Sequence, residues 1–371
     1  MRELYIGGSP YQIMNILNIV YHKQEAAERI LFVMDQFETA EHLVKKIEKS
    51  QLFSSVYLLR EDEVNLMPHG LKRYSRLMFD FLTPKLFMKS LLKDYPNAIE
   101  NLLGEKFDVI YAATAIRHIA AMVKLNPDAD FILFEDGTGS YRGNIIMASG
   151  SRLNLIFCKI FNVGSYACKP SKLLVNNVSM CQSTAVPQDR IFPLPELDKG
   201  FVDFCSSIFE MKRERKNSVL WLSQPIDSQP GAAEAREEMR ACLLPYKDKI
   251  IVRMHYLDVD YKFYRDFTID YGHDMWELSV LNEKENAGSL ILIGGYSTAQ
   301  VTPKLLFDME PILIFTHQFN KQKQGSRDRE EMRLSIGRRI EDLRKTYRNP
   351  EKIYNPKTAE ELSVILQKLI L

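Results

Sequence analysis

Short apolar runs alternate with longer amphipathic stretches in the first part of the chain. The runs are Leu4–Ile6, Ile30–Met34, Val56–Leu59, Val109–Ala112 and Phe131–Phe134. Because they are continuous and rich in Val, Ile, Leu, Phe and Tyr, they predict strands that are buried on both faces. The stretches between them, such as Tyr11–His22 and Glu38–Ser50, have apolar residues at helical spacing.

A second series of the same kind begins after residue 198. Its strand candidates are Ser218–Leu222, Ile250–Met254, Leu290–Ile293 and Pro311–Phe315. Amphipathic helices are predicted over Asp328–Tyr347 and Thr358–Leu371, with Thr358 as the N-cap of the last one. Repeated strand–helix–strand units predict parallel sheets with helices on both faces.

The pattern is weaker between Ser151 and Asp198, where Pro187, Pro193 and Pro195 interrupt the chain. We therefore predict an α/β protein with two doubly wound, Rossmann-like domains, residues 1–190 and 191–371. Ligands of such sheets bind at the carboxyl ends of the strands, so candidate residues are sought there.

Composition excludes some classes of partner and site. The 371 residues include 49 Lys and Arg against 48 Asp and Glu, so no overall field attracts nucleic acid. The five cysteines form no Cys-x-x-Cys pair, which argues against a disulfide framework or structural zinc and favours a reducing compartment. We expect a cytoplasmic protein, because the N-terminus lacks a signal-peptide run and the longest apolar stretch, Leu153–Val163, is too short to span a bilayer.

The clearest chemical candidate follows the predicted strand Phe131–Phe134. Glu135 and Asp136 are adjacent carboxylates, and Gly137 comes next. A carboxylate in a partly dry cleft can act as a general base, and glycine permits close approach of a ligand. A solvated turn capped by Asp136 is the alternative.

Two further candidates follow strands of the second series. His255, with Arg253 two residues before it, offers positive charge to a phosphate, and a structural histidine is the alternative. Gly295, Ser297 and Thr298 open a predicted helix whose N-terminus suits an anion, and an ordinary helix cap is the alternative.

No metal site is predicted from these patterns. Asp258 and Asp260 form an Asp-x-Asp triplet shortly after His255, and they stay open as a divalent-cation alternative.

The three segments together resemble the motifs of bacterial sialyltransferases: two acidic residues and a glycine, a histidine before a proline, and a pair of hydroxyl residues. With Ser9-Pro10-Tyr11-Gln12 and the total length, the chain is most similar to glycosyltransferase family 52, which includes lipooligosaccharide sialyltransferases. Tyr256 stands where that family has its proline, and Thr298 stands where a second serine is usual.

The resemblance implies a GT-B fold, with two Rossmann-like domains facing a central cleft, the first on the acceptor side and the second binding the CMP-sugar. Asp136 would be the general base, and His255 would bind and protonate the CMP phosphate. Ser297 and Thr298 would hold the same phosphate.

Other roles are carried over with less specific motifs. Glu277 is placed like the glutamate that contacts the cytidine ribose in similar enzymes. Asp227, which also follows a strand, is the second-choice base.

The implied function is inverting, metal-independent transfer of sialic acid from CMP-sialic acid, without a cofactor, to a galactose-terminated lipooligosaccharide or capsule glycan. The expected partners are the nucleotide-sugar donor and the glycan acceptor. Lipid-linked acceptors would bring the protein into peripheral contact with the cytoplasmic face of the inner membrane, and a homodimer stays open. Two alternatives are a GT-B transferase for another nucleotide sugar and a non-catalytic glycan- or nucleotide-binding homologue.

Overall fold

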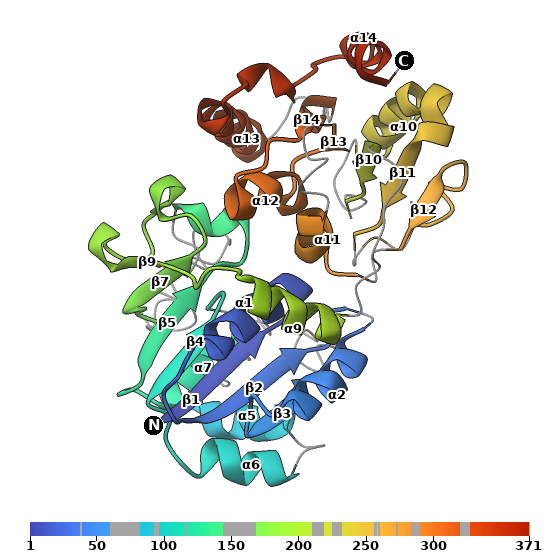
Figure 1. The fold of residues 1–371 in the computed structure, drawn as a ribbon. Helices are drawn as coiled ribbons and strands as arrows, with labels where there is room; N and C mark the ends of the chain where they lie inside the picture. Colours follow the sequence, from blue (N-terminus) through green and yellow to red (C-terminus); the bar gives the residue numbers. More distant parts are fainter. Residues whose placement is uncertain are drawn as a thin grey trace. The chain divides into compact units, whose positions relative to one another are not determined.

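The computed structural model separates into two compact units, Met1–Phe209 and Glu210–Leu371. Each contains one main parallel sheet covered by helices (Figure 1). The described residues are 1–37, 39–59, 82–92, 96–115, 117–143, 168–209, 219–224, 232–255, 258, 260–271, 274–282, 289–319 and 327–370.

The sheet of the first unit has seven parallel strands in the order β3-β2-β1-β4-β5-β7-β9. They are β1 (Arg2–Gly7), β2 (Glu28–Met34), β3 (Ser55–Leu59), β4 (Val109–Ala112), β5 (Asp130–Phe134), β7 (Lys172–Val175) and β9 (Ile191–Pro193). The sequence predicted the first five from their continuous apolar runs, which are largely buried except in the partly exposed β3. β7 and β9 were missed because they are short and partly exposed.

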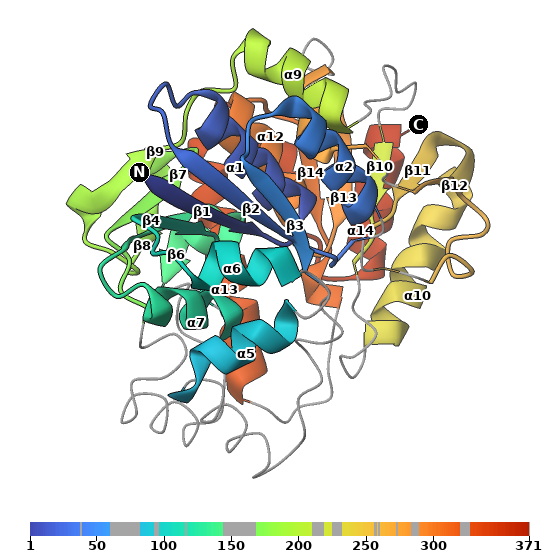
Figure 2. The same cartoon turned by 90° about the horizontal axis from the view of Figure 1, so that it is seen from below.

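Helices cover both faces of this sheet (Figures 1 and 2). One face carries α1 (Pro10–Tyr21), α2 (Ala40–Ser50) and α9 (Lys199–Phe209), and the other α5 (Pro84–Leu91), α6 (Pro96–Leu103) and α7 (Arg117–Leu125). A separate pair, β6 (Arg142–Gly143) and β8 (Gln182–Ser183), is also parallel. α1 begins where it does because Ser9 caps it: the Ser9 hydroxyl accepts the Gln12 N–H at 3.2 Å, and Pro10 starts the first turn.

The border between the units lies after residue 209, and the predicted border at 190/191 was wrong. β9 pairs in parallel with β7, with Ile191 opposite Leu173. α9 packs on α1, where the Tyr21 ring lies 5.6 Å from that of Phe201 and 5.4 Å from that of Phe204. The prolines at 193 and 195 therefore lie at a strand end and in a loop of the first unit, not in a linker.

The sheet of the second unit has six parallel strands in the order β12-β11-β10-β13-β14-β15. They are β10 (Val219–Leu222), β11 (Ile250–Arg253), β12 (Thr268–Asp270), β13 (Ile291–Gly294), β14 (Ile312–Phe315) and β15 (Ile353–Tyr354). Counted along the unit, this is the Rossmann order 3-2-1-4-5-6. The strand order therefore reverses between β10 and β13, the place where such sheets bind ligands.

The helices of the second unit are α10 (Ala232–Leu243), α11 (Trp276–Asn282), α12 (Thr298–Phe307), α13 (Arg327–Thr346) and α14 (Ala359–Ile370). α10 and α14 bury their apolar faces against one side of the sheet. Thr358 caps α14 as predicted, since its hydroxyl accepts the Glu361 N–H at 3.3 Å.

None of the helices in the described ranges is long and apolar enough to cross a membrane. The apolar stretch Leu153–Val163 lies outside the described residues.

Trp221 of β10 is the centre of the core beneath α10 and α14. It is 1% exposed, and its ring meets those of Tyr264 and Phe267 edge-on at 4.9 and 5.3 Å. Such aromatic contacts add to the large apolar area that a buried indole removes from water.

We expect Trp221→Ala to lower the unfolding free energy of the second unit by about 3–5 kcal/mol, because it leaves a large cavity. The chain has two tryptophans, and the other, Trp276, lies in the same unit. Trp276 fluorescence during urea unfolding therefore measures the change. Val364→Ala, at a position 66% exposed, is the matched control and should stay within about 0.5 kcal/mol. Equal midpoints for the two variants would contradict the central role of Trp221.

Candidate active site

The acid pair of the first unit lies at the carboxyl end of β5, and Glu135 is its buried member. Its side chain has no exposed surface. Oε1 accepts the Tyr11 hydroxyl at 2.5 Å, and Oε2 accepts the Tyr141 hydroxyl at 2.7 Å and the Asn176 backbone N–H at 2.8 Å. The Glu135 carbonyl accepts the Asn15 side-chain amide at 3.1 Å. Glu135 therefore holds α1, β5 and the end of β7 together and does not reach a substrate.

Burial and hydrogen bonding act in opposite directions on this carboxyl. Desolvation raises the pKa of Glu135, and the bonds from Asn176, Tyr11 and Tyr141 lower it. Burial also raises the pKa of Tyr141, and the neighbouring Glu135 adds to the rise. Both effects keep the Tyr141 hydroxyl protonated, as a donor to Glu135.

Asp136 is the accessible member of the pair. Its side chain is exposed, whereas its backbone N–H donates to the Ser140 hydroxyl at 2.8 Å. The Gln12 side-chain amide donates to Asp136 Oδ1. Desolvation by the surrounding protein raises the pKa of Asp136, and the bond from Gln12 opposes the rise. An accessible carboxylate with a raised pKa is suited to take a proton from a hydroxyl.

Gly137 makes this arrangement possible. Its φ of 120° lies where L side chains are strained, so glycine is required. The chain turns there from β5 into the short 3-10 helix Thr138–Tyr141, in which the Ser140 N–H donates to the Gly137 carbonyl at 3.0 Å. This turn places the Ser140 hydroxyl under Asp136 and the Tyr141 hydroxyl on Glu135.

In the second unit, His255 follows β11 on a loop held by its neighbours. The His255 backbone N–H donates to the Ser223 hydroxyl at 2.8 Å, and the His255 carbonyl accepts the Asp258 N–H at 2.8 Å. Asp258 is 3% exposed and accepts the Tyr264 hydroxyl at 3.0 Å.

Desolvation lowers the pKa of His255, although the charge of Asp258 opposes the fall. The imidazole is therefore neutral at neutral pH, where the sequence analysis expected a cation. A phosphate beside it would favour the protonated form again.

Arg253, expected on the donor phosphate, is engaged inside the unit. Nη1 donates to Asp270 at 2.8 Å and to Asp274 at 2.6 Å, and Nη2 donates to the Asp274 carbonyl at 2.6 Å. The residue is 7% exposed. Arg253 therefore fixes the end of β11 against the segment before α11, and its expected contact with the donor phosphate stays a prediction.

The hydroxyl motif follows β13 and starts α12. Ser297 is the N-cap in a capping box: its Oγ accepts the Gln300 N–H at 3.3 Å, and its N–H donates to Gln300 Oε1 at 3.2 Å. Gln300 is fully buried and donates to the Ile314 carbonyl at 3.2 Å. An N-cap uses its oxygen as acceptor and keeps its O–H as donor, so the capping role does not preclude an anion contact.

Gly295 lies beside Gln224, which follows β10. A Cβ at Gly295 would overlap the Gln224 side-chain oxygen, so a larger residue there would displace the Gln224 side chain. Gln224 Nε2 donates to the Tyr296 carbonyl at 2.9 Å. This bond joins the ends of β10 and β13, between which the strand order reverses.

Glu277 and Thr298 lie on neighbouring helix starts. Thr298 is the first residue of α12, and Glu277 is in the first turn of α11 and 6% exposed. The Trp276 indole N–H donates to the Ala299 carbonyl at 2.8 Å and ties the two helix starts together. The N-terminus of α12 adds partial positive charge to this end of the sheet.

The two carboxylates of the divalent-cation alternative, Asp258 and Asp260, already accept hydrogen bonds from protein side chains. Asp258 accepts from Tyr264, and Asp260 accepts the Arg236 guanidinium at 3.1 Å. Within the described ranges, no group of three or more His, Cys, Asp or Glu side chains is placed to hold a metal. Asp227 and Tyr256 lie outside those ranges.

The sequence analysis assigned no role to four donors that complete the first cluster. Tyr11, Gln12 and Asn15 lie on the first turns of α1, which follows β1, and Asn176 follows β7. The strand-end rule would have pointed to the start of α1. Asn176 gave no signal, because the pattern around β7 was weak.

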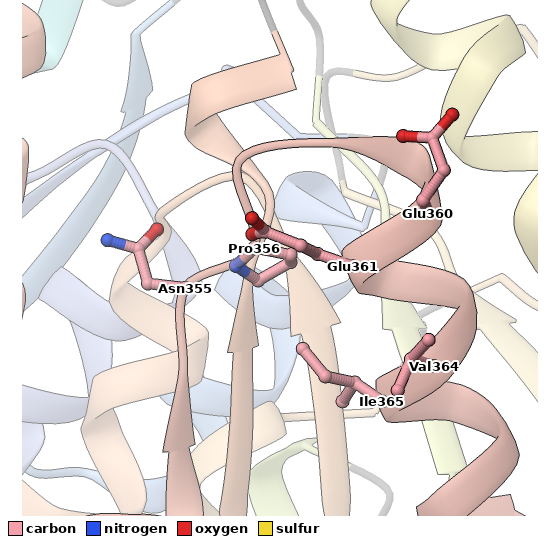
Figure 3. A pocket seen from close by; sticks show the side chains of 6 residues that line it. All are labelled: Asn355, Pro356, Glu360, Glu361, Val364 and Ile365. Carbon is pink, nitrogen blue, oxygen red and sulfur yellow. The ribbon is translucent and has the colours of Figure 1, made fainter.

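A separate hollow of about 460 Å³ lies on the second unit between the end of β15 and α14 (Figure 3). Its walls are Asn355, Pro356, Glu360, Glu361, Val364 and Ile365. None of the candidate residues lines it, so it is distinct from the strand-end clusters.

Comparison with solved structures identifies the fold. A UDP-N-acetylglucosamine 2-epimerase from Methanocaldococcus jannaschii, in complex with UDP-GlcNAc and UDP, has 12% identity and a TM-score of 0.51, covering 100% of this chain and 93% of that one. A Listeria monocytogenes protein assigned as the same type of epimerase has 9% identity and a TM-score of 0.52, covering 100% and 88%. A spinosyn rhamnosyltransferase complexed with thymidine diphosphate has 11% identity and a TM-score of 0.47, covering 100% and 92%. The fold class is GT-B, with two Rossmann-like units.

Sequence comparison identifies the family. No curated protein matches the chain. The model of the alpha-2,8-polysialyltransferase family matches residues 3–370, a range that includes both strand-end clusters. The expected kinship with a sialyltransferase family is confirmed at that level. This protein therefore belongs to the alpha-2,8-polysialyltransferase family and is a glycosyltransferase.

Proposed function

We propose that this protein transfers sialic acid from CMP-sialic acid to a glycan hydroxyl with inversion at the anomeric carbon. The observation that carries the proposal is the division of the acid pair. Glu135 is fully buried and engaged by donors, and Asp136 is exposed at a strand end in a chain of a sialyltransferase family. This division leaves Asp136 as the carboxylate that an acceptor hydroxyl can approach.

In the proposed reaction, the acceptor oxygen forms a bond to the anomeric carbon while the bond from that carbon to the CMP phosphate oxygen breaks. The hydroxyl proton moves to Asp136, and the bonding electrons leave with CMP. Attack opposite the leaving group inverts the configuration. The base is required because a neutral hydroxyl is a weak nucleophile.

The second unit is proposed to hold the donor. His255 would donate to the CMP phosphate, and the Ser297 hydroxyl and the N-terminus of α12 would stabilise its growing charge. Gly295 would let the phosphate approach the backbone, and Glu277 would contact the cytidine ribose. Because the imidazole and the helix start supply this stabilisation, we propose that the reaction needs no metal.

The proposal also concerns which glycan accepts the sialic acid. The name of the matched family favours a glycan that ends in sialic acid and is extended through an α-2,8 bond. A galactose-terminated lipooligosaccharide or capsule glycan, as in glycosyltransferase family 52, is the second candidate. Lipid-linked glycans of either kind would place the reaction at the cytoplasmic face of a membrane. A panel of sialylated and galactose-terminated oligosaccharides separates the two.

Replacing the proposed base tests the mechanism. We expect Asp136→Asn to lower kcat about 10²–10⁴-fold, because general base catalysis supplies a factor of that size. CMP-induced thermal stabilisation should stay unchanged, since the donor is held by the other unit. Turnover is measured as CMP release in the presence of acceptor. Asp128→Asn, exposed in the turn before β5, is the matched control and should retain wild-type turnover. Near-normal turnover in Asp136→Asn would remove this residue from the role of base.

The pH dependence of CMP binding tests His255. Burial lowers the pKa of His255 in the free protein, and contact with phosphate favours the protonated imidazole, so binding takes up a proton. Affinity should therefore rise as pH falls from 8 to 6, by up to about tenfold per pH unit. Calorimetry in buffers of different ionisation enthalpy measures the uptake. In His255→Ala, the pH dependence of CMP affinity that comes from the imidazole should be lost. Only the dependence caused by titration of the CMP phosphate should remain. Identical pH slopes in the two proteins would reject the contact.

A donor screen separates the competing functions. Because a ligand stabilises the state that binds it, we expect CMP to raise the melting temperature more than UDP or GDP. The reverse order would favour a GT-B transferase for another nucleotide sugar. Stabilisation by CMP without any CMP release from the donor would favour a non-catalytic homologue.

A further inference from the structure

The side chain of Gln12 makes two hydrogen bonds that link the start of α1 to the acid pair. Gln12 Oε1 accepts the Gly8 backbone N–H at 2.6 Å, and Nε2 donates to Asp136 Oδ1. The backbone of Gln12 is also fixed, because its N–H donates to the capping hydroxyl of Ser9 at 3.2 Å. Gln12 is therefore anchored at three points within the first unit, two through its side-chain amide and one through its backbone N–H.

These bonds leave the amide one orientation. A backbone N–H is only a donor, so the atom of Gln12 that faces Gly8 must be the carbonyl oxygen. The NH₂ group then faces Asp136, as an ionised carboxylate requires. The loop before α1 thus decides which group Gln12 presents to the acid.

We propose that Gln12 positions the Asp136 carboxylate for proton abstraction, holding Oδ1 so that Oδ2 is presented to the acceptor hydroxyl. The proposal rests on the proposed function, in which Asp136 is the base. Gln12 is a positioning residue in it and does not touch the reacting atoms. Without this bond, a solvent-exposed Asp side chain would sample several rotamers, and fewer of them would meet an incoming hydroxyl.

The same bond lowers the proton affinity of the base. Hydrogen bonding from Gln12 opposes the rise in the pKa of Asp136 that desolvation causes. Other titratable groups of this cluster are Glu135, Tyr11 and Tyr141, and both tyrosine hydroxyls donate to Glu135. Within the described chain, desolvation and Gln12 are the two influences resolved for Asp136. Removing the donor should therefore raise the pKa of the base.

The test is the pH profile of kcat/KM in Gln12→Met and Gln12→Glu, measured with the full-length protein, CMP-sialic acid and an acceptor oligosaccharide. Activity needs Asp136 ionised, so a higher pKa moves the acid limb to higher pH. We expect Gln12→Met to shift that limb upward by about one unit. Gln12→Glu keeps an acceptor for Gly8 but faces Asp136 with a second carboxylate, and should shift it further.

Gln36→Met is the matched control. Gln36 lies against the same loop, since a Cβ on Gly8 would lie 2.6 Å from its Oε1, and it has no bond to Asp136 among those of the described residues. Its profile should overlay that of the wild type. An equal shift in Gln36→Met and Gln12→Met would assign the effect to loop packing and overturn the proposal.

Failure of this proposal is distinguishable from failure of the proposed function. If Asp136→Asn is inactive and the acid limb of Gln12→Met overlays the wild type, Asp136 remains the base and Gln12 does not position it. If Asp136→Asn stays active, the assignment of the base fails first. If Gln12→Met does not fold, as judged by loss of its thermal transition, the pH profile of Gln12→Glu tests the proposal instead. An acid limb that is not shifted in Gln12→Glu also overturns the proposal.

Discussion

The acid pair of this protein depends on where one helix begins. Tyr11, Gln12 and Asn15 lie on the first turns of α1 and donate to Glu135 or Asp136. A helix turns by about 100° for each residue, so a start shifted by one position would turn all three donors away from β5. Ser9 prevents such a shift by capping the first turn. A cap at one end of the sheet thus sets the geometry of carboxylates more than 120 residues away in sequence.

Two adjacent carboxylates receive different roles from their surroundings. Side chains of successive residues at a strand end point in opposite directions, so Glu135 enters the protein and Asp136 faces solvent. Donors from α1, from the 3-10 turn and from the end of β7 surround Glu135, and both of its carboxyl oxygens accept hydrogen bonds. Asp136 is exposed, and its Oδ1 accepts the Gln12 amide. The chemistry of the pair therefore follows from environment, since the two side chains carry the same functional group.

The sequence predicted nine main-sheet strands because runs buried on both faces leave a local signal. The rule that ligands meet strand ends then located Asp136, His255 and Ser297 at such ends. Arg253 was assigned to the donor because its partners, Asp270 and Asp274, become neighbours only through β12 and the loop after it. The unit border was misplaced because proline marks a loop but does not tell whether the loop joins two domains. The sequence pattern is local, so it could not predict features that depend on residues distant in sequence, such as the ion pairs of Arg253.

The strand ends of the second unit combine a neutral imidazole with fixed dipoles. A free guanidinium there would attract any anion at all times, but Arg253 is paired with two carboxylates. Burial lowers the pKa of His255 and so favours the neutral imidazole, whereas the partial charge at the start of α12 does not titrate. If a phosphate binds there as proposed, it would itself induce much of the positive charge that holds it. In the proposed reaction, the phosphate would gain charge as CMP departs and the hydrogen bond from His255 would strengthen, which would favour bond breaking over tight binding of the intact donor.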